Sequence, residues 1–204
     1  MNSEEYLNDP CGASSLPFWK TKKVIIPEHI AVLREDLFCI ADCDGIDEPY
    51  FKLMHNLKQI RQPKLITQFE LIPCETLDFA NHINECYAEE SISLDELCAY
   101  YLRPVFDPNL WIAVRDATSN RIVATGIAEL DSCIGEGILE WIQVSPDYRR
   151  RGLGKFLVSE LLCRMKDKAK FVTVSGRMNN PDNPLALYLS CGFANPVIWH
   201  VVTK

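Results

Sequence analysis

The hydrophobic pattern of the chain is clearest where it predicts helices. From Leu153 to Met165 an apolar side chain recurs every four residues, which predicts an amphipathic helix over that stretch. Apolar residues at helical spacing predict another helix over residues 75–87. Ser93 is followed three residues later by Glu96, a pair that typically caps a helix start, so a further helix is expected there.

Short apolar runs between these helices are typical of strands. They cover residues 65–72, 110–115, 122–129, 138–144, 171–175 and 197–202, and a short helix is expected at 185–189. Helices therefore interrupt a set of strands that can pair mainly as antiparallel neighbours. This order predicts the α+β class, with a mixed, mainly antiparallel sheet flanked by helices.

Residues 1–63 carry a less regular pattern. Their first twenty residues contain prolines, a glycine and paired serines, which indicates irregular chain. Apolar residues on both sides of Pro27 predict two short strands, or one broken strand, within residues 22–34. Residues 51–60 are expected to form a short helix that ends before the next proline.

Composition and charge are those of a folded, globular protein. The chain has 204 residues, of which 48% are hydrophobic and 24% charged, and its net charge is −7. Such an acidic chain does not suit a general nucleic-acid binder, which needs a basic face. No apolar run approaches the roughly 20 residues that cross a bilayer, so no membrane partner is expected.

The nine cysteines indicate reduced thiols rather than disulfides. Their number is odd, their spacing is scattered, and the polar, acidic N-terminus is unlike an export signal, which together favour a cytoplasmic protein. The sequence has no C-x-x-C pair and no histidine pair at zinc-like spacing, so no metal is expected.

Charge is distributed unevenly along the chain. Residues 145–177 contain nine basic and three acidic side chains. Residues 65–102 contain no Lys or Arg but have eight acidic side chains: Glu70, Glu75, Asp78, Glu85, Glu89, Glu90, Asp95 and Glu96. This division suits an enzyme with one anionic and one cationic substrate, although solvated helix faces would explain much of the acidity.

The most informative segment is V-S-P-D-Y-R-R-R-G-L-G-K at residues 144–155. It joins a strand end to the first turn of the strongest helix, where unpaired N–H groups attract anions. Gly152 and Gly154 would let a phosphate approach the backbone, while Arg149, Arg150, Arg151 and Lys155 add positive charge. The turn lacks the third glycine of a dinucleotide-binding fold and the Ser or Thr of a P-loop.

This segment resembles the R/Q-x-x-G-x-G/A signature of the GNAT acyltransferases. L-A-L-Y-L-S-C-G-F at residues 185–193 is similar to the closing element of the same family, in the right order and at the right separation. The resemblance implies a GNAT fold over residues 64–204, with residues 1–63 as an N-terminal extension. That extension could cover the acceptor site, form a homodimer contact or extend the sheet.

The resemblance also implies the cosubstrate, acetyl-CoA, and the residues that contact it. The pantetheine arm would pair with a strand end. The pyrophosphate would lie against the amides of the turn at residues 150–155, which we call the glycine turn. The residues so implied are Gln143, Val144, Arg149, Arg150, Arg151, Gly152, Leu153, Gly154 and Lys155. Relatives usually have Asn and Ala where this chain has Pro181 and Pro184. One of the nearby Asn179, Asn180 and Asn183, with Asn180 and Asn183 as the candidates, is therefore expected to contact pantetheine instead.

Two further residues acquire catalytic roles through the resemblance. Tyr188 matches the tyrosine that donates a proton to the departing CoA thiolate. Glu140 is the best-placed general base, but the family glutamate aligns with Ile138, so a structural or substrate-orienting role for Glu140 stays open. Direct transfer needs no nucleophile, and Cys191 is interpreted as a packing residue.

The sequence therefore predicts an N-acetyltransferase that moves an acetyl group from acetyl-CoA to a primary, cationic amine by direct attack. The amine could belong to a small molecule or to a protein. The alternative is a catalytically inactive module that binds CoA as a sensor or interaction partner.

Overall fold

The computed structural model describes residues 1–87 and 90–204, with the backbone alone at residue 42. The described strands are β1 (Ile30–Arg34), β2 (Ile46–His55), β3 (Phe69–Ile72), β4 (Trp111–Asp116), β5 (Ile122–Asp131), β6 (Glu136–Val144), β7 (Phe171–Arg177) and β8 (Ala194–Thr203). The helices are α1 (Ser3–Asn8), α2 (Thr76–Cys86), α3 (Leu94–Cys98), α4 (Leu153–Met165) and α5 (Pro184–Ser190). Short 3-10 turns are η1 (Phe18–Lys20), η2 (Glu35–Leu37), η3 (Ile40–Asp42), η4 (Ala99–Leu102), η5 (Pro108–Leu110) and η6 (Pro146–Tyr148).

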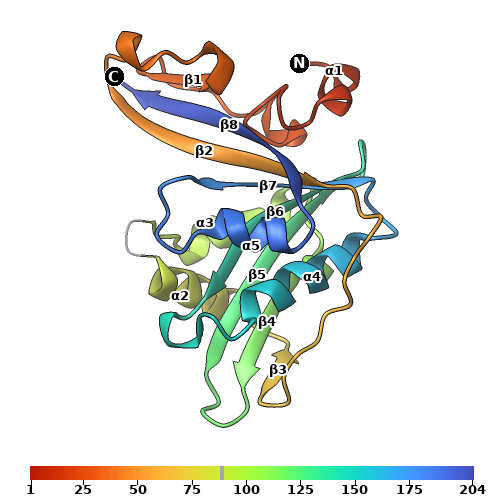
Figure 1. The fold of residues 1–204 in the computed structure, drawn as a ribbon. Coiled ribbons are helices and arrows are strands. Elements are labelled where there is room, and N and C mark those ends of the chain that lie inside the picture. The colour runs from red at the N-terminus through yellow and green to blue at the C-terminus, as the bar shows by residue number, and fades with distance from the viewer. Residues whose placement is uncertain (88–89) are drawn as a thin grey trace.

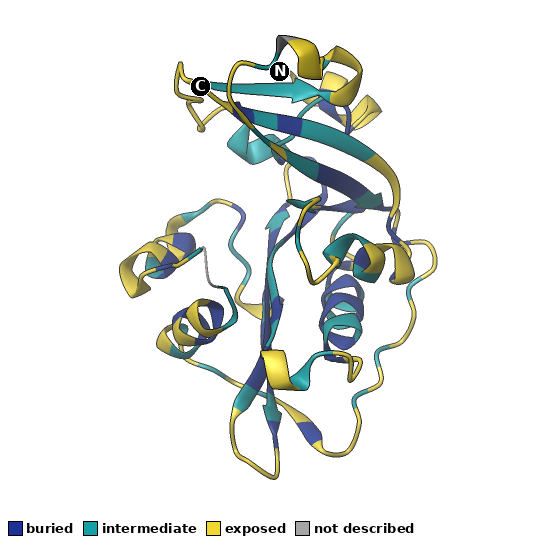
Figure 2. Cartoon of the chain, turned by 60° about the vertical axis from the view of Figure 1, so that its left-hand side comes forward, coloured by how far each residue is buried: buried dark blue, intermediate teal, exposed yellow. Residues whose placement is uncertain are grey.

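All the described strands belong to one sheet, in the order β1-β8-β2-β7-β6-β5-β4-β3 (Figure 1). Neighbours pair antiparallel except β6 and β7, which are parallel. Helices α2 and α3 lie on one side of the sheet, and α4 and α5 lie on the other, as the edge-on view in Figure 2 shows. The α+β class and the mixed, mainly antiparallel sheet are thus confirmed.

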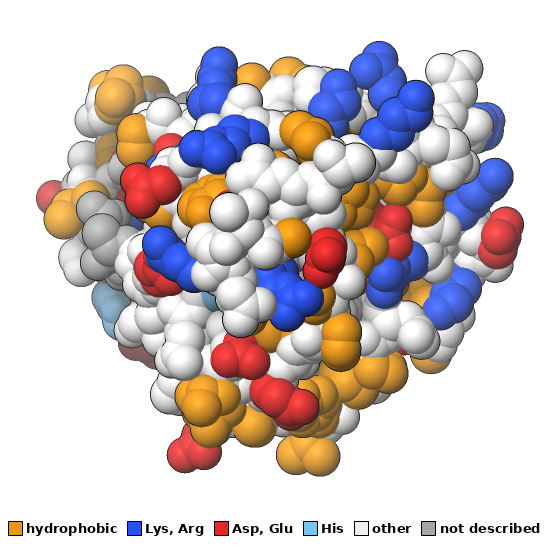
Figure 3. Space-filling view, turned by 90° about the horizontal axis from the view of Figure 1, so that it is seen from below, with side chains coloured by type: hydrophobic (Ala, Val, Ile, Leu, Met, Phe, Trp, Pro, Cys, Tyr) orange, Lys and Arg blue, Asp and Glu red, His pale blue; other side chains and the backbone are white. Residues whose placement is uncertain are grey.

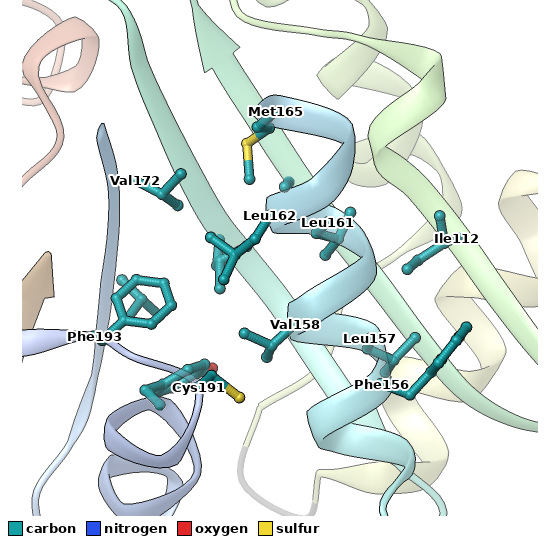
Figure 4. Close-up of a cluster of buried hydrophobic side chains, with 14 of the residues drawn as sticks. Ile112, Phe156, Leu157, Val158, Leu161, Leu162, Met165, Val172, Cys191 and Phe193 are labelled. Carbon is teal, nitrogen blue, oxygen red and sulfur yellow. The ribbon is translucent and has the colours of Figure 1, made fainter. Parts of the chain in front are cut away.

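Helix α4 supplies most of the packing on its side of the sheet. Leu157 and Leu161 have no exposed surface, and Met165 extends the same row toward β7 (Figure 4). Fully burying each such side chain stabilises the fold by about 1.5–3 kcal/mol. On the opposite side, α2 and α3 bury Ile83 and Leu97 in a second cluster. The two clusters hold the sheet rigidly between helices.

Each helix and strand predicted after residue 64 is present, with ends shifted by a few residues. The capped start at Ser93 is also present, because Glu96 N donates to Ser93 Oγ at 3.2 Å while Ser93 N donates to Glu96 Oε2 at 2.8 Å. Before residue 64 the prediction is less successful. Only Ile30–Arg34 is a strand where two strands or one broken strand were expected, since the residues after Pro27 form a turn.

The helix predicted over residues 51–60 is wrong, because strand β2 occupies the first half of that stretch and residues 56–60 are not helical. It lies between β7 and β8 and pairs antiparallel with both. Phe51 and Leu53 face the α4 cluster, while Lys52 is buried on the opposite face. A strand covered on both faces has a continuous rather than alternating apolar pattern, which periodicity alone does not separate from a helix.

Residues 6–18 cover the face of the sheet behind Lys52. Lys52 as a whole is 1% exposed. Its ammonium donates to Tyr6 Oη at 3.0 Å and to the carbonyls of Pro10, Ser14 and Leu16 at 2.8, 2.9 and 2.8 Å. Glu136, also buried, accepts from Tyr6 Oη at 2.6 Å and from Phe18 N at 2.9 Å. A buried charge is tolerated only when it is paired and hydrogen-bonded, so this network holds the N-terminal segment in place.

The sheet runs across the predicted boundary between residues 63 and 64. Strands β1 and β2 lie before it and pair with β7 and β8, which lie after it. Residues 1–63 therefore extend the sheet, one of the three roles left open. Their description as an extension of a separate domain over 64–204 stays a prediction.

Candidate functional site

Strands β6 and β7 separate from one another halfway along. Their parallel pairing joins Glu136–Leu139 to Phe171–Val174 and stops there, while β6 continues to Val144 paired with β5 alone. Beyond Leu139, the described part of β6 has no strand neighbour on its β7 side. An extended ligand can pair with backbone groups at such an opening in the manner of an added strand.

Glu140 is the first residue of β6 beyond this parallel pairing, and it forms a bulge. Ile127 of β5 opposes Trp141 and the next residue, Ala128, opposes Leu139, so Glu140 is an extra residue in β6. A bulge bends its strand and redirects side chains. Trp141 packs with the α2 cluster, whereas Ile142 and Leu139 pack with the α4 cluster.

The Glu140 carboxylate lies near a second carboxylate, that of Glu129. Glu140 Oε1 accepts from Lys20 Nζ at 2.6 Å. Glu129 of β5 accepts from Arg103 Nη1 and, at 3.0 Å, from Trp19 Nε1. Burial, with the negative charge of Glu140 nearby, raises the pKa of Glu129 to about 7.

The glycine turn lies on the other side of the opening and begins α4. Gly152 is the N-cap, with φ 85° and ψ 0°, a left-handed conformation that favours glycine. Its position is otherwise open, since an added Cβ would meet nothing within 4 Å. A Cβ on Gly154 would come within 3.2 Å of Leu187 Cδ2, so this glycine allows α4 and α5 to approach closely.

A cavity of about 730 Å³ extends from the glycine turn to the end of β6 and to α5. Among its lining residues are Gln143, Val144, Arg149, Arg150, Gly152, Leu153, Gly154, Lys155, Asn180, Asn183 and Tyr188. The structure therefore brings together most residues that the sequence motifs single out, but Glu140 is not among the residues that line this cavity. Arg151 lies apart, lining a second cavity, with its Nη2 donating to Asp147 O at 3.1 Å.

Several of these lining side chains are held by their neighbours. Asn183 caps α5, because its Oδ1 accepts from Ala186 N at 3.2 Å. Arg149 forms an ion pair with Asp182 at 2.7 Å, which ties the glycine turn to the loop before α5. The Gln143 amide donates to Thr125, but its Oε1 is buried and has no partner within the described residues.

Tyr188 on α5 lines the cavity with a buried ring. The ring packs against Phe51 and Phe193, with centroids 6.1 and 5.7 Å away. Within the described chain, its hydroxyl has no hydrogen-bond partner. Burial raises the pKa of Tyr188 well above its ordinary value, so the phenol stays protonated at neutral pH. Cys191 is buried in the same cluster, and burial raises its pKa, unlike that of an activated nucleophile.

Four residues near the opening were not predicted. Tyr87 lines the cavity, and its hydroxyl lies 3.4 Å from Ile142 O. Lys20 pairs with Glu140, Glu129 lies near Glu140, and Arg103 pairs with Glu129. Only Glu129 left a signal in the sequence, as a lone acid within the otherwise apolar strand 122–130.

The acidic stretch over residues 65–102 is largely occupied by internal partners. Glu70, Glu85 and Glu90 pair with Arg115, Arg121 and Arg177 at 2.9, 3.0 and 3.3 Å. Glu75, Asp78 and Glu96 take part in the capping of α2 and α3. Glu89 lies outside the described residues. The stretch is therefore not an open surface of unpaired carboxylates.

Among the described residues, no group of three or more His, Cys, Asp or Glu side chains is arranged to hold a metal ion. None of the helices in that part of the chain has the length and apolar composition needed to cross a membrane. All nine cysteines are free. A cytoplasmic location stays a prediction, as does a homodimer.

Residues 107–195 match the family model described as the acetyltransferase (GNAT) domain. Among solved structures, the chain is similar to a GCN5-related N-acetyltransferase from Sphaerobacter thermophilus, with a TM-score of 0.65 and 16% identity over 76% of this chain and 51% of that one. It is also similar to a GNAT-family acetyltransferase from Colwellia psychrerythraea, with a TM-score of 0.61 and 16% identity over 91% and 69% of the two chains.

A third similar structure is the ribosomal-protein-S18-alanine N-acetyltransferase from Escherichia coli, with a TM-score of 0.50 and 17% identity over 66% of this chain and 93% of that one. Identities this low show a shared fold alone. The chain spans about half the length of the Sphaerobacter protein. No curated protein matches the sequence.

Proposed function

We propose that this chain, which carries an acetyltransferase domain of the GNAT superfamily, moves an acetyl group from acetyl-CoA to a primary amine. The observation that carries the proposal is the opening between β6 and β7, which leads into a cavity bounded by the glycine turn and by Tyr188. An acyl-CoA is long, anionic at its middle and reactive at one end. The cavity offers a basic helix start for the anionic middle, a strand edge for the arm that follows it and a tyrosine for the reactive end.

The cofactor would be held mainly by backbone groups. Its pyrophosphate would accept hydrogen bonds from amides of the turn at residues 150–155, where α4 begins and its first N–H groups lack intrahelical acceptors. Its pantetheine arm would pair with Gln143 and Val144 at the unpaired edge of β6. Asn180 or Asn183 would contact the same arm from the loop before α5.

Acetyl transfer then requires three proton movements. The acceptor ammonium loses a proton to the Glu140 carboxylate, and the free amine attacks the thioester carbonyl carbon. The C–S bond breaks as the amide forms, and the departing thiolate takes the Tyr188 proton. The nitrogen releases its second proton in the same collapse, and that proton restores the Tyr188 phenol. The result is an acetylated amine and free CoA. The location of Glu140 directly beyond the β6–β7 pairing, with Tyr188 on the cavity wall, supports this division of roles.

The charges around Glu140 support a cationic acceptor. The carboxylates of Glu129 and Glu140 already bind a guanidinium from Arg103 and an ammonium from Lys20. An acceptor amine that reaches Glu140 must compete with the Lys20 ammonium for the same oxygen. A second positive charge on the acceptor would strengthen this competition, whereas an acceptor carboxylate would weaken it.

We therefore expect amines with an additional positive charge to be the best acceptors. A panel of polyamines, amino sugars, lysine peptides, neutral amines and acidic amino acids, followed by thiol release from acetyl-CoA, checks this expectation. Acceptor KM should rise between low and physiological salt, because exposed charges more than about 8–10 Å apart are then screened. An acidic amino acid as the best acceptor, with no salt dependence, would contradict it.

Glu140→Gln tests the identity of the base. We expect kcat/KM to fall about a hundredfold at every pH, with unchanged affinity for CoA, because the amide cannot accept a proton. Glu85→Gln, which removes an exposed carboxylate paired with Arg121, is the matched control and should keep full activity. If Glu129 were the base, the variant would stay active. Its pH–rate profile would also shift to lower pH, because the Glu140 charge, which helps to raise the pKa of Glu129, would be gone.

The alternative of an inactive CoA-binding module is favoured by one observation, the ion pair between Lys20 and Glu140. If the Lys20–Glu140 ion pair stayed closed, Glu140 could not accept a proton from an acceptor amine. The chain would then bind CoA without transferring the acetyl group. The two functions separate in one assay: an enzyme releases thiol from acetyl-CoA when amines are added, and a binding module gives calorimetric CoA binding without release.

A further inference from the structure

The connection between β2 and β3 crosses the start of α4. Strand β2 lies between β7 and β8, whereas β3 is at the far edge of the sheet. Residues 56–68 must therefore pass over the α4 side of the sheet, as the path in Figure 1 shows. Because of this crossing, residues from the N-terminal part of the chain lie against the glycine turn.

A second cavity, of about 330 Å³, lies between this crossing segment and α4. Gly152, Leu153 and Lys155 line both cavities, so the two meet at the glycine turn. Phe156 and Ser159 form part of the α4 wall of the second cavity, and residues 61–66 form the other wall. A ligand that crosses the turn can therefore occupy both.

The second cavity is lined by four cations from two distant parts of the chain: Arg61, Lys64, Arg151 and Lys155. Unlike Arg149, which pairs with Asp182, none of the four forms an ion pair with a carboxylate among the described residues. Figure 3, which views the molecule from below, shows Lys and Arg side chains gathered over the upper part of this face. Uncompensated positive charge at a cavity favours an anion with more than one negative charge.

We propose that this second cavity holds the 3′-phosphoadenosine end of the cofactor, with Arg61 and Lys64 binding its 3′-phosphate. The inference rests on the proposed function. The pyrophosphate of CoA joins pantetheine on one side to the nucleotide on the other. When the pyrophosphate lies on the glycine turn and pantetheine enters the larger cavity, the nucleotide extends toward the smaller one. The crossing segment thus makes the chain selective for CoA over its 3′-dephospho form.

The choice of a phosphate follows from the side chains. Arg61 can donate two parallel hydrogen bonds to phosphate oxygens, and Lys64 adds a mobile point charge. General attraction by exposed basic side chains would also favour CoA, because CoA carries more negative charge, but it would weaken whichever two cations were removed. Selectivity that depends on Arg61 and Lys64, and not on other exposed lysines, is therefore the property that separates a built subsite from general attraction.

Calorimetric titration with CoA and with 3′-dephospho-CoA tests the proposal. We expect the chain to bind CoA about tenfold more tightly, because hydrogen bonds to a charged group are worth roughly 1.5–3 kcal/mol and a tenfold ratio requires about 1.4 kcal/mol. In Arg61→Ala/Lys64→Ala the ratio should fall to about one, while the affinity for 3′-dephospho-CoA should stay unchanged.

The matched control is Lys166→Ala/Lys170→Ala. It removes two positive charges that are exposed and lie at and beyond the opposite end of α4, so the tenfold ratio should persist. Equal binding of both compounds by the unmodified chain, or a ratio that survives in the Arg61/Lys64 variant, would overturn the subsite and leave the proposed function standing. Failure of both compounds to bind would overturn the proposed function and the subsite together.

Discussion

Replacing Gly154 with glutamate is expected to abolish CoA binding without unfolding the protein. The residue lies in the first turn of α4 and lines the larger cavity beside Arg150 and Lys155. A carboxylate there would occupy the place of the pyrophosphate and repel it. Two like charges about 4 Å apart cost about 4 kcal/mol at an effective dielectric constant of about 20, so we expect affinity to fall more than about a hundredfold.

The fold should tolerate this change because the contact at Gly154 is with a side chain. An added Cβ comes within 3.2 Å of Leu187 Cδ2, and Leu187 is only partly buried, so a small rotation relieves the contact. Gly154→Gln is the matched control, since it has nearly the same volume without the charge, and it should bind CoA more tightly than the glutamate variant. Calorimetry and thermal unfolding measure the two effects separately. Unchanged CoA affinity in Gly154→Glu would remove the turn from the cofactor site.

The elements that sequence patterns located correctly are those with one buried face. Helix α4 has an apolar residue every four positions because only one side of it packs on the sheet. The start of α3 is set locally, by two hydrogen bonds between Ser93 and Glu96. Such features depend only on residues within a few positions of one another, so they can be predicted from a short stretch of sequence.

Strand β2 was missed because its environment comes from distant parts of the chain. Phe51 packs beneath Tyr188, and Lys52 binds carbonyls of residues 10–16, so both faces are buried. The alternation that identifies a strand is then absent. A lysine in an apolar run also favours an exposed surface, whereas here four acceptors make its burial tolerable.

The residues of the candidate site also divide into those that local sequence motifs predict and those that depend on distant contacts. The turn, the end of β6 and the loop before α5 follow from two local motifs, and most of their residues line one cavity. The contacts of Glu140 and Glu129 do not follow from local motifs. Lys20 pairs with Glu140 across 120 residues, and Arg103 pairs with Glu129 across 26 residues. The bulge at Glu140 was also invisible, since it depends on the register of β5 against β6.

Tyr188 is the residue on which the chemistry of the proposal depends most. Its ring is fixed between Phe51 and Phe193, and burial raises its pKa, so it can donate a proton throughout the usual pH range. The group it would protonate is a thiolate formed only as the C–S bond breaks. An acid of this kind stabilises the transition state and contributes little to binding of the ground state.

Tyr188→Phe should therefore lower kcat by about 10²–10⁴ while leaving the affinity for acetyl-CoA within about twofold. Phenylalanine keeps the packing against Phe51 and Phe193, so thermal stability should change little. Tyr87→Phe is the matched control, because Tyr87 lines the same cavity but its hydroxyl lies near the carbonyl of Ile142. Stopped-flow or steady-state thiol release, with calorimetry on the same samples, separates kcat from binding. Equal turnover in Tyr188→Phe and the unmodified chain would return Tyr188 to a packing role, and a larger loss in Tyr87→Phe would assign the proton to the other tyrosine.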